Sequence, residues 1–308
     1  MTPAGLRAAA LVLRLDREAV RVCGLLDAAA IPNLILKGPA LKHWLYPAGD
    51  RGYGDIDLLV PESQQPAALD LLAAEGYADI APGASGLETA EHARTLVAPE
   101  GITVDLHTRL HTTAVTGDIV WDLLSADARR LTLAGGEVRV CDLIPQLLVV
   151  VLHAAQHGAT EPKPIEDLRR SGLVVTDDQL RRAAILAART GAAESFAAGL
   201  RLNPSLAARL PDLVALPGNL LVKALAGDGH KTPGLVLLAR AQSANRRRSL
   251  RILARAIWPT PGFLRIGLST NHSQRPGWII GARIKRAGYQ ITQIDGALRA
   301  LWRLHRGG

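Results

Sequence analysis

Cysteine is scarce in this 308-residue chain, in which only Cys23 and Cys141 occur. The two are far apart and lack the close spacing of metal-binding cysteine pairs, so the sequence excludes a disulfide-built secreted scaffold. Long apolar runs are also lacking, since the longest, at about residues 147–152, falls far short of the roughly 18 residues that a membrane span needs. The sequence therefore predicts a cytoplasmic protein without a stable membrane span.

Aromatic residues are few as well, at 4% of the chain, whereas apolar residues make up 48%. This composition predicts a core built mainly of Ala, Leu and Val, and it argues against intrinsic disorder. A chain of 308 residues can bury a sizeable core, in one large domain or in two smaller ones.

Acidic residues are nearly absent from the last part of the chain. Residues 240–308 contain fourteen Lys and Arg against the single acid Asp295, a net charge of +13, whereas the first 239 residues carry 22 against 27, a net charge of −5. A clustered positive region predicts an anionic partner, such as a phosphorylated substrate, nucleic acid or an anionic membrane surface. Solvated faces of Arg-rich helices are the alternative interpretation.

The most informative stretch is residues 31–60, IPNLILKGPALKHWLYPAGDRGYGDIDLLV. Its first apolar run, at 34–36, predicts a buried strand. Lys37 and Gly38 interrupt this run, and Pro39 favours the first turn of a helix at that position. The stretch therefore predicts a strand that passes through a glycine turn into a short helix.

Three aspartates lie on predicted strands. On the strand at 55–60, alternation places Asp55 and Asp57 on one face and apolar side chains on the other. Two such carboxylates repel each other and are tolerated mainly when a cation lies between them. Asp105 lies on the second strand of a hairpin predicted further along, between two apolar neighbours.

Three segments carry a resemblance to a known family. Residues 36–40 (LKGPA), 51–60 with the Asp-Ile-Asp of 55–57, and 104–107 (VDLH) follow one another in an order that resembles the DNA polymerase beta-like nucleotidyltransferase superfamily. Their wording is closest to a bacterial branch of largely uncharacterised nucleotidyltransferase-like proteins, although a proline stands where a serine or glycine usually follows the glycine. The resemblance implies an α/β (α+β) fold with a mixed-sheet nucleotidyltransferase core.

The second half of the sequence reads as all helical. Together with the first half, this pattern predicts a nucleotidyltransferase-like α/β domain over residues 1–142 and a helical domain with the basic C-terminal tail over residues 143–308. In the second domain, helices are predicted at 145–157, 165–170, 178–190, 192–202, 216–226, 234–258 and 276–304.

Asp55, Asp57 and Asp105 are the candidate catalytic residues and metal ligands. Nucleotidyl transfer needs the phosphate charge neutralised and the acceptor oxygen deprotonated, and two Mg2+ ions about 3.5–4 Å apart can do both. Carboxylates are the hard oxygen ligands that suit Mg2+. In this interpretation Asp55 and Asp57 bridge both ions, and Asp105 completes the ion that activates the acceptor or takes its proton. The alternative is a strand cap at Asp55 and surface acids at the other two positions.

Lys37, Gly38 and Arg51 are the candidate residues for binding the phosphates of an NTP, the expected donor substrate. Glycine permits a close backbone approach, and the start of the following helix offers free N–H groups to an anion, of which Pro39 removes one. Lys37 contacts phosphate in this interpretation and lies on an edge strand in the alternative. Arg51 either clamps the triphosphate bidentately or is a solvated loop arginine.

Histidines supply two further hypotheses. His107 follows Asp105 by two residues, so both side chains face one side of the strand and His107 becomes a candidate for the acceptor site. His153 and His157 share one face of a predicted helix and could bind a metal with Asp167 as partner. A histidine pair without a third clear ligand more often lines a polar pocket.

The sequence therefore predicts a Mg2+-dependent transferase that moves a nucleotidyl group from an NTP to an unidentified, anionic acceptor. The accepting group is a hydroxyl or phosphate on a small molecule, sugar or peptide. One alternative uses the same metal site to transfer a sugar or sugar phosphate from a sugar nucleotide. Another is a non-catalytic protein that binds nucleotide or nucleic acid, which the basic tail favours. A third is a scaffold docked on an anionic membrane through a basic amphipathic helix at 246–258.

Overall fold

The computed structural model describes residues 3–46, 51–80, 92–215, 234–235, 237–238, 246–265 and 278–306. The chain divides into two compact units. The first comprises residues 1–79, 92–152 and 166–193, and the second comprises residues 80–91, 153–165 and 194–308. The two-domain division after residue 142, which the sequence suggests, stays a prediction.

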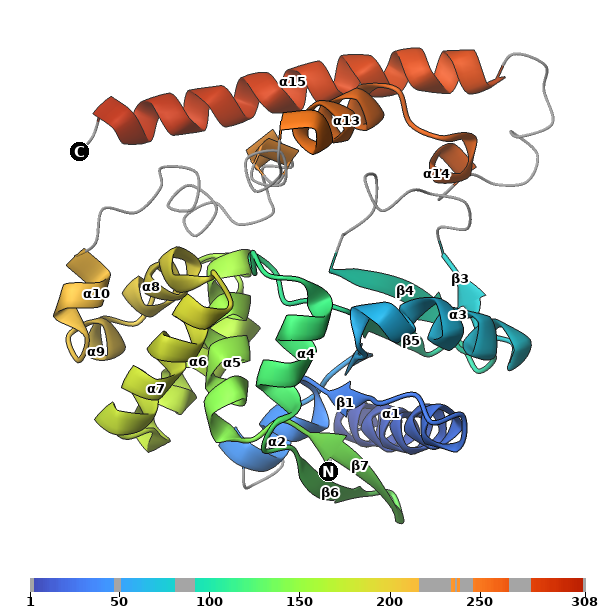
Figure 1. Ribbon diagram of the computed structural model, residues 1–308, viewed down its shortest axis with the longest axis vertical. Helices are drawn as coiled ribbons and strands as arrows, with labels where there is room; N and C mark the ends of the chain where they lie inside the picture. The colour runs from blue at the N-terminus through green and yellow to red at the C-terminus, as the bar shows by residue number, and fades with distance from the viewer. Residues whose placement is uncertain are drawn as a thin grey trace. The chain divides into compact units, whose positions relative to one another are not determined.

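Seven strands form one mixed sheet in the first unit (Figure 1). In chain order they are β1 (Leu34–Ile35), β2 (Asp55–Leu59), β3 (Ala78–Asp79), β4 (Ala93–Val97), β5 (Thr103–His107), β6 (Arg129–Leu133) and β7 (Gly136–Val140). Across the sheet the order is β3-β4-β5-β2-β1-β7-β6, with β2–β5 and β1–β7 parallel and the other neighbours antiparallel. The mixed α/β fold predicted from the sequence is confirmed.

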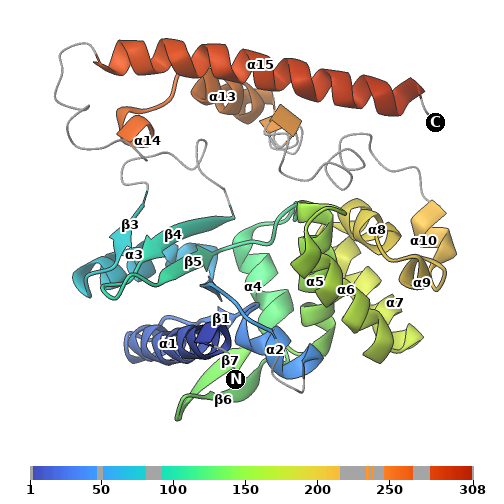
Figure 2. The same cartoon turned by 180° about the vertical axis from the view of Figure 1, so that it is seen from behind.

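One face of the central strands is part of the apolar core. It packs with α1 (Pro3–Ala28) and α3 (Gln65–Ala74), and its residues on β2 and β5 are Ile56, Leu58, Val104 and Leu106. Seen from behind (Figure 2), α1 runs beside β1 and β7, and it contacts β2, β6 and β7. Burial of each large apolar side chain stabilises the fold by about 1.5–3 kcal/mol. Because side chains alternate along a strand, the acids of β2 and β5 face the other side.

A tight turn after β1 leads into α2 (Pro39–Leu45). Gly38 adopts a φ of 50°, in the region where a side chain is strained, and an added Cβ would lie 3.4 Å from the ring of Tyr53. The backbone N–H of Leu36 donates to the carbonyl oxygen of Asp57 at 3.0 Å. This bond fixes the turn beside the middle of β2.

The rest of the described chain is helical apart from short connections. The first unit adds the 3-10 turn η1 (Glu62–Gln64), α4 (Gly117–Ser125) and α7 (Asp177–Arg189), while α5 (Leu143–His157) and α6 (Pro162–Val174) run through both units. The later helices are α8 (Ala193–Arg201), α9 (Pro204–Ala207), α10 (Pro211–Ala215), α13 (Arg246–Ile257), α14 (Pro261–Arg265) and α15 (Trp278–Arg306).

Several helices expected in the second half are present. The one predicted at 216–226 lies outside the described residues, and so does most of 234–245 in the one predicted at 234–258. The helix predicted at 276–304 corresponds to α15, which begins at Trp278. No helix within the described ranges combines the length and the hydropathy of a membrane span.

Candidate active site

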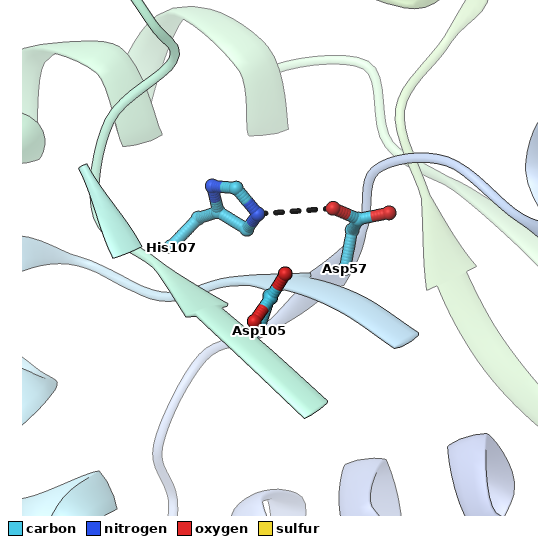
Figure 3. Close-up of side chains that lie close together, drawn as sticks. All are labelled: Asp57, Asp105 and His107. Atoms are coloured by element: carbon cyan, nitrogen blue, oxygen red, sulfur yellow. Dashed lines mark hydrogen bonds and ion pairs between the residues drawn. The ribbon is translucent and has the colours of Figure 1, made fainter. Parts of the chain in front are cut away.

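The parallel pairing of β2 with β5 brings the candidate site together. Its register places Asp57 opposite Asp105 and Leu59 opposite His107, so three polar side chains share one face of two neighbouring strands. One ligand atom each from Asp57, Asp105 and His107 lies within 4.8 Å of the others (Figure 3). In the part of the chain that the structure describes, these three residues form the group that could hold a metal ion.

Asp57 is the centre of this group. Its Oδ1 lies 2.7 Å from Nζ of Lys37 and 3.0 Å from Nε2 of His107. Asp57 and His107 are buried, with 5% and 7% of their surface exposed, and Asp105 is half-buried. Asp105 accepts a hydrogen bond at 2.6 Å from the hydroxyl of Thr95, its partner across the β4–β5 ladder.

The surroundings of Asp57 keep it ionised. Burial alone raises the pKa of a carboxyl group. The ammonium of Lys37, and then the hydrogen bond from His107, more than offset this effect and hold the pKa of Asp57 well below its usual range. The site therefore presents a buried negative charge at neutral pH, which is the condition for binding a cation.

Asp55 precedes this group on the same strand. It pairs in register with Thr103, at the beginning of β5, and is half-buried. The alternation of β2 gives it the same face as Asp57, as expected from the sequence. It is outside the three-residue group, so its role as a bridging metal ligand stays a prediction.

Arg51 makes a buried ion pair with Asp167 of α6. Its Nε and one terminal nitrogen donate to the two carboxylate oxygens at 2.9 and 2.8 Å, and the other terminal nitrogen donates to the carbonyl of Gly38 at 3.2 Å. The hydroxyl of Tyr46 donates to Asp167 at 2.7 Å, and the Arg170 guanidinium lies 4.1 Å from the centre of the Tyr46 ring. This network holds the glycine turn, and the triphosphate-clamp role of Arg51 stays a prediction.

The metal site suggested for His153, His157 and Asp167 does not form in the described residues. Asp167 pairs with Arg51 instead. A buried carboxylate is stable only beside a cation, and the spacing of residues along a helix does not show which cation that is. The His153 and His157 rings lie edge to face, with their centroids 4.4 Å apart.

Two histidines beside the site have no counterpart among the sequence-based candidates. The ring of His92 lies 5.5 Å from that of His107 and 5.6 Å from that of His111, measured between centroids. His92 immediately precedes Ala93, which pairs with His107 in the β4–β5 register. Since the hairpin itself is predicted from the sequence, its register is the signal that would have identified His92.

The donor set fits a divalent cation. Two carboxylates supply hard oxygen ligands, and the imidazole of His107 supplies a nitrogen that first-row divalent ions also accept. The acids come from two strands of the sheet, so their separation is set by the ladder rather than by flexible loops. The sequence predicts Lys37 at the donor phosphates, and in the structure its ammonium contacts the carboxylate of Asp57.

Comparison with known proteins identifies a family for this chain. Residues 1–207 match the model of a family described as uncharacterised nucleotidyltransferase. No match was found among the curated proteins. A solved structure, an antigenic nucleotidyltransferase-like protein from Paracoccidioides brasiliensis, is 16% identical over 64% of this chain and 92% of its own, with a TM-score of 0.36. That likeness is too low to carry an argument.

The family match extends over two thirds of the chain. It includes the glycine turn with Lys37, both carboxylate strands and Asp167 of the ion-pair network. The chain therefore belongs to the family of uncharacterised nucleotidyltransferases.

Proposed function

We propose that this protein is a Mg2+-dependent nucleotidyltransferase. It moves a nucleotidyl group from an NTP, such as ATP, to a hydroxyl or phosphate on a small molecule, sugar or peptide. The observation that carries the proposal is the register of β2 and β5, which gathers Asp57, Asp105 and His107 around one position. The free, buried thiols Cys23 and Cys141 favour a reducing cytoplasm as the place of the reaction.

The residues divide the work in this proposal. Bound Mg2+ ions would neutralise the triphosphate and make the acceptor oxygen more nucleophilic. Asp57 and Asp55 would hold the ions, and Asp105 would be a further ligand on the acceptor side. Lys37 contacts the donor phosphates, and Gly38 lets the backbone approach them. Arg51 fixes this turn through its ion pair with Asp167 and its hydrogen bond to the carbonyl of Gly38.

The test is calorimetric titration of the four NTPs, in Mg2+ and in EDTA, into the wild type and Asp57→Asn. The matched control is Glu137→Gln, because Glu137 is an exposed acid paired with Arg130 in the β6–β7 hairpin. We expect Mg2+-dependent binding of at least one NTP in the wild type and the control, and its loss in Asp57→Asn. Binding that persists in Asp57→Asn would refute the metal-site assignment.

Absence of binding by every NTP would instead refute the donor assignment. Sugar nucleotides would then be titrated in the same way, because transfer of a sugar phosphate can use the same carboxylates. This outcome is distinct from loss of the site, since Mg2+ binding itself can be measured without any nucleotide.

A second function, non-catalytic binding of nucleic acid, is favoured by one observation, the net charge of +13 in residues 240–308. Arg247 and Arg251 of α13 are exposed and available to phosphates. Binding of this kind releases counterions, so affinity for a single-stranded RNA should fall steeply as salt rises. Weak RNA binding at low salt with no such slope would rule this function out.

A further inference from the structure

A lysine of the protein forms an ion pair with the central carboxylate of the candidate metal site. Nζ of Lys37 lies 2.7 Å from Oδ1 of Asp57, the same oxygen that His107 contacts at 3.0 Å. The hydrogen bond from Leu36 N–H to the Asp57 carbonyl oxygen holds the residues after β1 beside the middle of β2. This pairing positions the Lys37 side chain next to the Asp57 carboxylate. Asp105, by contrast, accepts a hydrogen bond from the neutral hydroxyl of Thr95.

We propose that Lys37 and the divalent cation exchange on Asp57, and that the donor triphosphate receives the displaced ammonium. Lys37 is then a positioning residue that makes metal binding and donor binding depend on each other. This inference rests on the proposed function for the identity of the donor, whereas the exchange on Asp57 concerns the metal alone.

Competition follows from the geometry of the ion pair. A Mg2+ ion would bind a carboxylate oxygen at about 2.0–2.1 Å. The same oxygen already has an ammonium at 2.7 Å, and two cations this close repel each other strongly in a buried site. In the proposed exchange the metal ion takes this oxygen, and the Lys37 head group moves away from Asp57.

The triphosphate offers the displaced ammonium a new partner. Lys37 has a flexible four-carbon stem and keeps 18% of its side chain exposed, so its head group can leave Asp57 without unfolding the turn. Phosphate oxygens form strong charge-assisted hydrogen bonds with ammonium groups. Metal alone or donor alone leaves one charge without a partner, whereas the two together satisfy every charge. Positive coupling between them is the consequence.

The neighbouring ion pair shows what a fixed pair looks like. Arg51 binds both oxygens of Asp167 with a planar guanidinium, only 4% of its side chain is exposed, and Tyr46 donates to the same carboxylate. The Lys37–Asp57 contact uses one oxygen and lies nearer to solvent. One glycine turn therefore adjoins a fixed pair on one side and an exchangeable pair on the other.

The variant that tests the exchange is Lys37→Met, which keeps most of the stem and removes the charge. Its matched control is Lys42→Met, which removes the same charge from the next lysine of the chain. Mn2+ binding without nucleotide would be followed by the electron paramagnetic resonance signal of the free ion. NTP binding would then be measured by calorimetry at saturating Mg2+.

We expect opposite signs in the two measurements. Lys37→Met should bind Mn2+ alone at least about 5-fold more tightly than the wild type, the lower end of typical coupling factors, and should bind NTP more weakly. Lys37→Arg, which keeps the charge, should not show the gain in Mn2+ affinity. Mn2+ binding that is unchanged or weaker in Lys37→Met would overturn the exchange, because a purely structural ion pair would weaken both ligands together.

The two arms separate this inference from the proposed function. A gain in Mn2+ affinity in Lys37→Met supports the exchange even if the wild type binds no NTP, a result that removes only the NTP as donor. Circular dichroism of each variant checks that the fold is intact. If Lys37→Met does not fold, Lys37→Gln takes its place with the same expected gain, and the absence of that gain overturns the exchange.

Discussion

The first unit, which contains the sheet and is called the sheet unit below, uses charge differently from the C-terminal helices. In the sheet unit the important charges are few, buried and paired, as in Arg51–Asp167, with side-chain exposures of 4% and 1%. In α15 the pair Arg299–Asp295 has exposures of 74% and 54%. The positive net charge of the chain comes from residues 240–308, whereas the candidate metal site lies in the sheet unit.

Apolar side chains show the same contrast. On β2 the apolar side chains Ile56 and Leu58 are at most 1% exposed, whereas Ile284 and Trp302 of α15 are 64% and 54% exposed. Exposed apolar side chains of this kind are typical of surfaces that contact a partner. The comparison teaches that a small number of positioned charges identifies a candidate site better than a large net charge does.

The largest effect on stability should come from breaking the buried pair. Arg51→Met leaves the Asp167 carboxylate buried without its guanidinium, and we expect a loss of about 3–5 kcal/mol in the free energy of unfolding. The double variant Arg51→Met, Asp167→Leu should recover a large part of this loss, because it removes the unpaired charge as well. Urea denaturation followed by tryptophan fluorescence measures both. A single-variant loss below about 1 kcal/mol would place this pair with ordinary surface ion pairs.

Local sequence pattern identifies the two strands that carry the candidate site and the three residues Asp57, Asp105 and His107 on them. The alternation around Asp57 and around Asp105 predicts both strands, and the structure pairs them as parallel neighbours. Alternation is a property of neighbouring residues and can therefore be read from the sequence. His107 followed from the same period, since it lies two residues after Asp105 on the same strand.

The partners of the charged residues were beyond such reasoning. Arg51 and Asp167 are 116 positions apart, and nothing in either local pattern indicates the other. The sequence groups Asp167 with two nearby histidines, whereas in the structure its carboxylate pairs with Arg51. The sequence predicts Lys37 at the donor phosphates, which stays a prediction, whereas its contact with Asp57 depends on the pairing of β1 with β2. Long-range pairing is decided by packing, which a local pattern does not contain.

Alkaline pH should destabilise the sheet unit by an intermediate amount. Burial raises the pKa values of the thiols of Cys23 and Cys141 to about 12, and the pKa values of Tyr46 and Tyr77 are raised as well. The unfolded thiol has a pKa of about 8.5, so between that pH and about 12 the unfolded state loses protons that the folded state keeps. The stability that these groups contribute is therefore complete below pH 8.5 and is lost as the pH rises.

The expected loss at pH 10 is about 2 kcal/mol for each thiol. Urea denaturation at pH 7, 8, 9 and 10 measures it, and Cys141→Ala should show a shallower pH dependence than the wild type. A thiol reagent should also fail to label either cysteine at pH 8 until the protein unfolds, since both are at most 1% exposed. Equal slopes for Cys141→Ala and the wild type would show that its thiol is not the group responsible.

The smallest effect should come from the exposed pair on α15. Asp295→Asn removes one partner of Arg299, but both groups remain in water, so the temperature midpoint of unfolding should not change measurably. The same variant removes the single acid of residues 240–308 and raises their net charge from +13 to +14. Because polyanion binding depends on this charge, Asp295→Asn should elute from a heparin column at slightly higher salt than the wild type. A lower temperature midpoint of unfolding with unchanged elution from heparin would mean that Asp295 stabilises the packing of the helices. The distinction between positioned charges and surface charges would then fail on α15, where it is expected to be clearest.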